Sequence, residues 1–346
     1  MKTRRLLQLA LSSLAETTWR RLRGQPVADS WPFRFECLLT FVRKRYRHLR
    51  AESLETIREA EEAIALDPRG EFSRFATDLD GVDCEWFLAD PAAETAPKPG
   101  SRAIVYLHGG GYVFGSTNTH ADLLTRLTRR LDAPVLGVNY SLCPESSLDD
   151  AVDDVISVIR TLVDHGWSPQ RLALAGDSAG GGLAVSSAVA LRDGAGPLPA
   201  ALGLLSPWAD LRCDGDSYGE NADTDYMTRE MVAEIAERVC HDRPLDHPVA
   251  SPVCDDLEDL PPTLIHAGGA EVLLDDARRL SSRLENVGVD VTCRVWPEMV
   301  HVFHSFSRVL PPADTALDEF AAFLEDTVEA DPSEQVGEPS ASKNVA

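Results

Sequence analysis

Short apolar runs alternate with longer helical segments along most of the chain. The runs are four or five residues long and lie at residues 103–107, 134–138, 172–175, 201–205, 263–267 and 291–295. Segments with helical periodicity cover residues 121–131, 148–165, 179–192, 229–240, 275–287 and 315–327. A continuous apolar run is typical of a strand that is buried on both faces. The alternation therefore predicts an α/β fold, with a mostly parallel central sheet and helices on both of its faces.

Two regions interrupt this alternation. Residues 1–69 are helical up to about Leu66, and after the Asp67-Pro68-Arg69-Gly70 break residues 72–90 favour two strands that turn at Asp80-Gly81. Residues 207–259 separate two strands by about 50 residues, a length that usually marks a functional loop or lid. We therefore expect a catalytic domain of residues 70–206 and 260–328, with a helical layer formed by residues 1–69 and 207–259.

The first helix has an amphipathic pattern. Leu7, Leu11, Leu14 and Thr18 fall on one helical face, beside a basic flank. We expect this helix to pack on the acidic surface of the body, and contact with a membrane surface is the less favoured alternative. Polar residues break the apolar stretch too often for a secretory signal. The sequence also has no stretch of 18 apolar residues, so it predicts no membrane-spanning segment. Residues 329–346 are polar, and we expect them to form a disordered tail.

The charge of the chain is unevenly distributed. The 346 residues include 33 basic and 56 acidic side chains, yet residues 1–50 carry 12 basic and 3 acidic ones (+9), which leaves −32 for the rest. An acidic body repels phosphate, which argues against DNA or RNA as a partner. The seven cysteines lack a C-x-x-C pair or zinc-site spacing. We therefore expect a reduced, cytoplasmic protein with no metal and no cofactor.

A candidate nucleophile lies where the run at residues 172–175 meets the helix that follows. Residues 176–180 read Gly-Asp-Ser-Ala-Gly, with Ser178 at the centre. A nucleophilic serine on a sharp turn requires a strand before it, a helix after it and small neighbours, and all three are present. The start of the helix also adds the positive end of its dipole. The alternative is an incidental serine in a Gly-rich turn.

A glycine-rich loop follows the run at residues 103–107. Its presence makes an incidental serine at position 178 the weaker interpretation. Residues 108–111 read His-Gly-Gly-Gly, and successive glycines allow backbone N–H groups to approach a substrate oxygen. We expect Gly109 and Gly110 to form an oxyanion hole for acyl transfer, with the N–H of Ala179 as a third donor. A phosphate-binding loop does not fit, because this loop matches neither G-x-x-x-x-G-K nor G-x-G-x-x-G.

The order of residues in the chain selects the base and narrows the acid. In this type of fold the serine precedes the acid, and the acid precedes the histidine. Only His301 and His304 come late enough, and His301 directly follows the turn after the last apolar run. The acid candidates are Glu271, Asp275 and Asp276, and capping of the next helix explains at least one aspartate. The residues alone favour His301 and Glu271, and they leave the aspartates open.

Several motifs together resemble the hormone-sensitive-lipase-like branch of the α/β-hydrolases over about residues 103–306. They are residues 108–111 and 176–180, Asn139-Tyr140 with Pro144-Glu145, Ser-Pro-Trp-Ala-Asp at 206–210, Glu-Val-Leu-Leu-Asp-Asp at 271–276 and Met-Val-His-Val-Phe at 299–303. The family's D-P-L-x-D segment has its triad acid at the first position, which implies Glu271 here. Glutamate is a departure that adds one methylene, and Asn139 stands where the family often has aspartate.

The resemblance implies a capped serine carboxylesterase that acts on short- to medium-chain esters of small molecules. Residues 1–69 and part of 207–259 would form the cap. Aromatic residues are candidates for substrate binding, although packing is their commoner role: Tyr112, Trp208, Trp31, Phe33, Phe35 and Phe41. Alternatives are a lactone or carbamate hydrolase on the same triad, a ligand-binding receptor on the same fold, or a lipid hydrolase attached to a membrane. A homodimer is left open.

Overall fold

A computed structural model of the protein describes residues 3–131 and 133–328. Its centre is an eight-stranded sheet with the strand order β1-β2-β4-β3-β5-β6-β7-β8. Neighbours from β4 to β8 in this order are parallel, and β2 pairs antiparallel with both β1 and β4. The strands are β1 (Ser73–Leu79), β2 (Val82–Leu88), β3 (Ala103–Leu107), β4 (Val135–Val138), β5 (Leu172–Asp177), β6 (Ala201–Leu205), β7 (Thr263–Gly268) and β8 (Val291–Trp296). The expected fold is confirmed, and the predicted tail at 329–346 lies outside the described residues.

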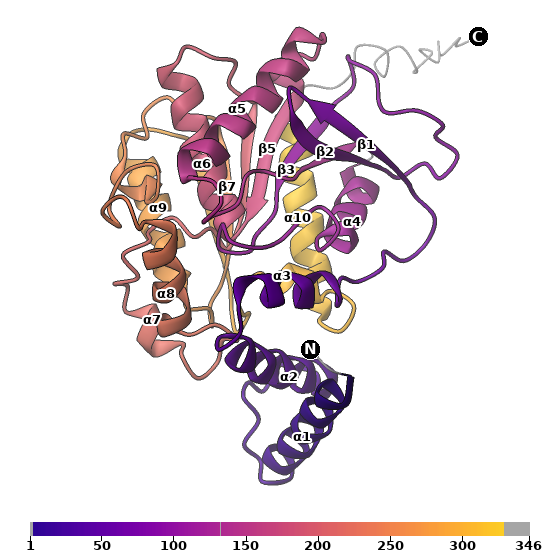
Figure 1. The fold of residues 1–346 in the computed structure, drawn as a ribbon, viewed down its shortest axis with the longest axis vertical. Coiled ribbons are helices and arrows are strands. Elements are labelled where there is room, and N and C mark those ends of the chain that lie inside the picture. The colour runs from indigo at the N-terminus through magenta and orange to yellow at the C-terminus, as the bar shows by residue number, and fades with distance from the viewer. Residues whose placement is uncertain (1–2, 132, 329–346) are drawn as a thin grey trace, which may run out of the picture.

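Helices cover both faces of the sheet (Figure 1). On one face α4 (Ala121–Leu131) and α10 (Pro311–Thr327) share an apolar cluster with the strands. On the other face pack α5 (Leu148–Asp164), α6 (Ala179–Asp193) and α9 (Leu274–Asn286). Every residue of β3, β4, β5 and β6 is buried, which explains why these strands are continuous apolar runs in the sequence.

The boundaries of helix α10 and strand β5 differ from the expected ones by more than one residue. Helix α10 begins at Pro311, whereas the periodicity predicts a start at residue 315. Proline has no N–H and a backbone angle close to the helical value, so it fits the first turn of a helix without cost. Strand β5 continues through Gly176 and Asp177, two residues beyond its apolar run. The strand therefore leads directly into Ser178.

The N-terminal helices lie together at one end of the molecule (Figure 1). They are α1 (Thr3–Leu22), α2 (Phe33–Leu49) and α3 (Leu54–Glu62), and α1 is the outermost of the three in Figure 1. Helix α1 packs on α2 through Ser13 and Thr17, which are buried, while Leu7, Leu11 and Leu14 are exposed. The expectation that α1 packs on the acidic body is therefore wrong, because its contact is with α2 and Leu7, Leu11 and Leu14 face outward.

The segment between β6 and β7 lies beside the N-terminal helices. It contains the short helix α7 (Ser217–Glu220) and the expected helix α8 (Arg229–Val239). Arg43 of α2 donates to the carbonyl of Ala222 at 3.0 Å, and Arg50 donates to Glu234 of α8 at 2.7 Å. The two pieces of chain are thus in contact, and their grouping as one cap remains a prediction.

Aromatic residues connect the N-terminal segment to the loop after β8. Trp31 and Phe35 are fully buried and share an apolar cluster with Phe303, and the Trp31 indole donates to the carbonyl of Glu298 at 2.7 Å. Phe33 is exposed. Packing is therefore the role that the structure gives Trp31 and Phe35.

None of the helices within the described residues is long and apolar enough to cross a lipid bilayer.

Candidate active site

Ser178 lies on a strained turn between β5 and α6. Its backbone angles are φ 53° and ψ −120°, a region that residues other than glycine rarely adopt. The turn is tight: a Cβ atom on Gly180 would lie 2.1 Å from the carbonyl oxygen of Leu107, and one on Gly176 would lie 2.5 Å from Gly180. The glycines of the motif are therefore a steric requirement of this turn. They allow the strand, the serine and the helix to follow one another without a loop.

His301 lies in the loop between β8 and α10 and reaches Ser178 across the end of the sheet. Its Nε2 atom is 2.9 Å from the Ser178 Oγ, which is hydrogen-bond distance. Both side chains are buried. The residue after the histidine, Val302, has a φ of 43°, so the loop reverses sharply at this point. The geometry allows the imidazole to accept the proton of the serine hydroxyl.

Glu271 lies behind His301 in the loop after β7. Its Oε2 atom is 3.6 Å from the Nδ1 of His301, too long for a hydrogen bond but close enough for charge interaction. The same Oε2 accepts a hydrogen bond of 2.6 Å from the hydroxyl of Ser206, and that hydroxyl accepts one of 3.0 Å from the N–H of Val302. Ser206 therefore links the loop of the acid to the loop of the histidine.

A second buried carboxylate, Asp225, also joins these two loops. It accepts hydrogen bonds from the N–H groups of Val272 at 2.8 Å, Tyr226 at 2.7 Å and His301 at 3.4 Å. Burial raises the pKa of Asp225 to about 6, although the nearby His301 and the backbone donors favour its charged form. Sequence reasoning missed Ser206 and Asp225 as parts of the site. Ser206 begins the Ser-Pro-Trp-Ala-Asp segment, whereas nothing in the pattern around Asp225 marks it.

The other candidates for base and acid have different partners. His304 stacks on His266, with its Nε2 3.3 Å from the His266 Nδ1. Burial lowers the pKa of His266 to about 3 and holds that of His304 well below its usual range, so both rings are neutral. Asp275 accepts from the N–H of Ser217 at 2.9 Å, and Asp276 accepts from the N–H of Asp210 at 3.1 Å. Both aspartates lie in the first turn of α9, as expected, but neither caps the helix, because their side chains bind N–H groups outside α9.

The glycine-rich loop passes in front of Ser178. The N–H of Gly109 donates to the buried carboxylate of Asp177 at 3.1 Å, and this carboxylate also accepts from the hydroxyl of Tyr106 at 2.9 Å. Within the described part of the chain, the N–H groups of Gly110 and Gly111 donate to no other residue. The N–H of Ala179 is the first of α6 and has no partner inside the helix.

Asp177 and His120 form a buried ion pair beneath this loop. The His120 Nε2 is 3.3 Å from the Asp177 carboxylate. Burial lowers the pKa of His120, but the Asp177 carboxylate, the carbonyl of Ser116 and the Glu61 carboxylate together raise it more, and the net shift is upward. In return, burial raises the pKa of Asp177 while His120 and Tyr106 lower it, with a net downward shift. Each side chain of the pair therefore favours the charged form of the other, and the Asp177 carboxylate fixes the position of Gly109.

Tyr112 and Trp208, the expected substrate-binding residues, lie side by side next to the glycine-rich loop. Their ring centroids are 6.1 Å apart, and both side chains are buried. The N–H of Trp208 donates to the carbonyl of Ser178 at 2.9 Å. Neither the Tyr112 hydroxyl nor the Trp208 indole N–H has a hydrogen-bond partner among the described residues. Two buried polar atoms of this aromatic pair are therefore left without partners.

Cysteine and metal chemistry have little support in the described residues. Burial raises the pKa of Cys84 to about 12 and those of Cys143 and Cys240 to about 11, which makes these thiols poor nucleophiles. All seven cysteines are free. No group of three or more His, Cys, Asp or Glu side chains in residues 3–131 and 133–328 is arranged to hold a metal ion.

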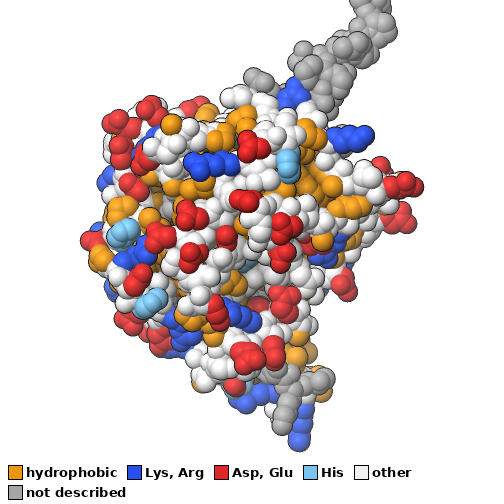
Figure 2. Space-filling view, turned by 45° about the horizontal axis from the view of Figure 1, so that its top comes forward, with side chains coloured by type: hydrophobic (Ala, Val, Ile, Leu, Met, Phe, Trp, Pro, Cys, Tyr) orange, Lys and Arg blue, Asp and Glu red, His pale blue; other side chains and the backbone are white. Residues whose placement is uncertain are grey.

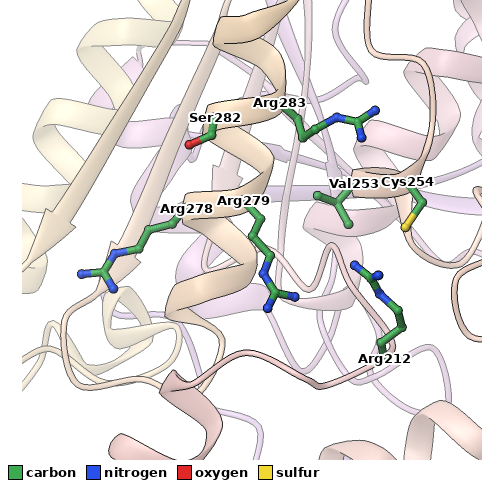
Figure 3. A pocket seen from close by; sticks show the side chains of 7 residues that line it. All are labelled: Arg212, Val253, Cys254, Arg278, Arg279, Ser282 and Arg283. Atoms are coloured by element: carbon green, nitrogen blue, oxygen red, sulfur yellow. The ribbon is translucent and has the colours of Figure 1, made fainter.

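A surface hollow of about 480 Å³ lies away from these residues, on the outer side of α9 (Figure 3). It is lined by Arg212, Val253, Cys254, Arg278, Arg279, Ser282 and Arg283. Arg212 and Arg279 both bind the carboxylate of Asp210, at 2.6 Å and 2.9 Å, so much of its positive charge is already compensated. It shares no residue with the Ser178 cluster and is not part of the candidate active site.

Both the sequence and the structure of this chain are similar to those of known proteins. A protein family that is described by the alpha/beta hydrolase fold matches residues 104–305 of the chain. An acetyl-hydrolase of Streptomyces hygroscopicus is 44% identical over 64% of this chain and 75% of its own length. An esterase of Acinetobacter venetianus is 33% identical over 66% of this chain and 76% of its own. A crystal structure of an esterase from the bacterial hormone-sensitive lipase family matches with a TM-score of 0.77 and 37% identity, over 84% of this chain and 98% of that one.

Proposed function

The chain belongs to the hormone-sensitive-lipase-like family of α/β-hydrolases, and on this premise we propose that it hydrolyses short- to medium-chain carboxylic esters through an acyl-enzyme on Ser178. The observation that carries the proposal is the 2.9 Å separation between the Ser178 Oγ and the His301 Nε2 on a strained turn. The names of the similar proteins, an acetyl-hydrolase and two esterases, support the ester class.

The proposed reaction has two steps. His301 accepts the proton of Ser178 as the Oγ attacks the ester carbonyl carbon, and it then gives this proton to the departing alcohol. The acyl group stays on the serine. Water then attacks the acyl-enzyme with His301 again as the base, which releases the carboxylic acid and restores the serine hydroxyl. The buried positions of both side chains support proton transfer without competition from bulk water.

We assign Glu271 as the acid of the triad. Its carboxylate lies 3.6 Å from the His301 Nδ1, so its charge stabilises the imidazolium that forms during each step. Catalytic hydrogen bonds are often long in the absence of substrate. We therefore expect the two loops to move slightly closer when the ring becomes charged, so that the Glu271 carboxylate accepts a hydrogen bond from the His301 Nδ1. Ser206 and Asp225 act as positioning residues, because they bind backbone or carboxylate atoms on both loops.

The oxyanion hole of this proposal is built from backbone N–H groups at the glycine-rich loop and at the start of α6. Gly110 and Ala179 keep their expected roles, and both have N–H groups free to donate. Gly109 could serve only by giving up its hydrogen bond to Asp177, so we assign the third donor to Gly111. Gly109 then contributes indirectly, by fixing the loop on the Asp177–His120 pair.

The cap limits the size of the substrate in this proposal. Trp208 binds the carbonyl of Ser178 through its backbone N–H, and α2 contacts the segment at 207–259, whose Tyr226 lies 6.0 Å from the His301 ring. A small enclosed site favours short acyl chains over emulsified fat. The seven free thiols fit a reducing compartment, and the cytoplasm remains the expected location.

A panel of p-nitrophenyl esters tests the proposal. Acetate, butyrate, octanoate and palmitate should give kcat/KM values that are highest for the short acyl chains and fall beyond octanoate. The Ser178→Ala variant should show no turnover above background with butyrate. A preference for palmitate would contradict the substrate class, whereas turnover by Ser178→Ala would contradict the mechanism.

A further inference from the structure

Helix α1 is attached to the molecule by its polar face. Thr17 lies 3.4 Å from Thr40 of α2 through their hydroxyl oxygens, and Glu16 binds Lys44 of α2 at 2.9 Å. Arg21 binds the buried carboxylate of Glu36 at 2.5 Å. These contacts hold α1 on α2 without using the side chains of Leu7, Leu11, Leu14 or Leu22.

The opposite face of α1 is apolar and exposed. Leu7, Leu11, Leu14 and Leu22 are 60%, 59%, 48% and 79% exposed, and their spacing places them on one side of the helix. Trp19 is also 57% exposed. Among the described residues there are eight exposed large apolar side chains, and these five all belong to α1. A soluble helix normally buries such a stripe, so this face, defined by these five residues, needs a partner.

Charge indicates the kind of partner. Residues 3–23 contain five arginines and one acidic residue, Glu16, which is already paired with Arg20 and Lys44. The guanidinium of Arg23 lies 4.2 Å from the centre of the Trp19 ring. A face of leucine and tryptophan with arginines around it is typical of a helix that lies in the surface of an anionic membrane.

Two other occupants fit less well. A second copy of the chain would bring two basic α1 helices together in a symmetric contact, and their arginines would repel. The chain's own residues 329–346 are acidic, but valine is their largest apolar side chain, so they cannot cover a leucine stripe. A lipid surface supplies both the apolar phase and the negative charge.

We propose that the apolar face of α1 binds the protein to anionic lipid surfaces as an interfacial helix. Helix α1 is at the extreme end of the molecule, away from the sheet (Figure 1), so a flat surface can reach it. Behind it, Tyr46 of α2 stacks on Tyr226 at 5.8 Å, and Tyr226 lies 6.0 Å from the His301 ring. Binding through α1 therefore turns the cap side of the molecule toward the membrane. The proposal does not depend on the chemistry at Ser178.

Sedimentation with vesicles tests this proposal on the full chain. The probes are vesicles of phosphatidylcholine alone and of an equal mixture of phosphatidylcholine and phosphatidylglycerol, each at low and high salt. We expect binding to the mixed vesicles, at least about tenfold weaker binding to phosphatidylcholine, and weakening by salt. Trp19 fluorescence, isolated by comparison with the Trp19→Phe variant, should shift to shorter wavelength on binding.

Two matched variants distinguish binding through the apolar face of α1 from binding through exposed apolar side chains elsewhere. The triple variant Leu7→Gln, Leu11→Gln, Leu14→Gln should lose vesicle binding about tenfold or more and keep its hydrolysis of p-nitrophenyl butyrate, which shows that it is folded. The control Ile64→Gln, Leu66→Gln removes two exposed apolar side chains outside α1 and should bind like the parent. Failure of the parent chain to bind mixed vesicles, or unchanged binding by the triple variant, would overturn the proposal. So would a lipid-free dimer that the triple variant dissociates, since the partner would then be a second copy.

Discussion

Two buried carboxylates approach His301 from different sides. Glu271 faces its Nδ1 atom at 3.6 Å, and Asp225 accepts from its backbone N–H at 3.4 Å. Only Glu271 is placed to meet the charge that develops on the ring, whereas Asp225 holds the backbone on which the ring is mounted. The two residues should therefore fail in different ways when they are replaced.

Replacing Glu271 by glutamine removes the negative charge behind the imidazole but keeps the shape of the side chain. We expect kcat/KM for p-nitrophenyl butyrate to fall about a thousandfold or more, because the amide cannot stabilise the imidazolium. Asp275→Asn is the control in the same region and should change kcat/KM by only a few fold. A larger loss with Asp275→Asn would show that the acid has been assigned to the wrong residue.

Replacing Asp225 by asparagine leaves one oxygen in place of two carboxylate oxygens that accept from three backbone N–H groups. We expect kcat/KM to fall about ten- to a hundredfold, since small displacements of a catalytic group are costly. Since burial raises the pKa of Asp225 to about 6, the part of the parent's activity loss that comes from protonation of this carboxylate below pH 6 should be absent in the variant. An equal loss of kcat/KM at every pH would show that the role of Asp225 is purely structural.

Much of the candidate site could be predicted at the residue scale, for a physical reason. Ser178 is marked by its strand, its glycines and its helix, and His301 by chain order. Asp225 could not be predicted, because its role depends on hydrogen bonds to backbone groups 47 and 76 residues away in the chain. The engagement of Gly109 with Asp177 was equally hidden, since sequence does not show which way an N–H group points.

At the scale of elements, the buried strands were the most predictable features. Strands β3 to β6 are buried throughout, so their apolar runs are unbroken. Helix α1 was predicted correctly as amphipathic but with the wrong face inward. Its inner contacts include a threonine pair and ion pairs, which a pattern of hydrophobicity does not register.

The stacked pair of His266 in β7 and His304 after β8 gives an element-scale prediction about acid stability. Burial lowers the pKa of His266 to about 3, so the folded protein binds fewer protons there than the unfolded chain. The stability from this group is complete above pH 6.5 and is lost as the pH falls from 6.5 toward 3. We expect His266→Phe, which keeps the aromatic packing, to weaken this pH dependence in urea unfolding measured between pH 7.5 and 5. An unchanged dependence would contradict the assignment of neutral, buried rings.

At the scale of the whole molecule, a basic N-terminal segment rests on an acidic body. Acidic side chains are spread over the visible surface in Figure 2. The contact is not held by charge alone. Arg58 of α3 donates to the carbonyl oxygens of Val113 at 2.7 Å and Cys143 at 2.9 Å, and it also binds the exposed Glu145. The hydrogen bonds to carbonyl groups resist salt better than the exposed ion pair.

Arg58→Ala should therefore loosen the cap. We expect a loss of about 1–3 kcal/mol in the free energy of unfolding, from the hydrogen bonds between a charged donor and the carbonyl oxygens. Activity should fall as well, because Val113 directly follows the glycine-rich loop and Tyr112. The exposed Arg34 of α2 provides the control, and Arg34→Ala should change both quantities little. Equal effects of the two replacements would argue against a specific anchor at Arg58.

The most direct test of the central claim is covalent trapping of the nucleophile. The protein is treated with an activated phosphotriester that mimics the attacked ester, and the site of modification is located by peptide mass spectrometry. The account predicts one diethylphosphoryl group on Ser178, complete loss of esterase activity with it, and much slower labelling in His301→Ala. Labelling of another residue with loss of activity, or labelling at an unchanged rate without His301, would contradict it.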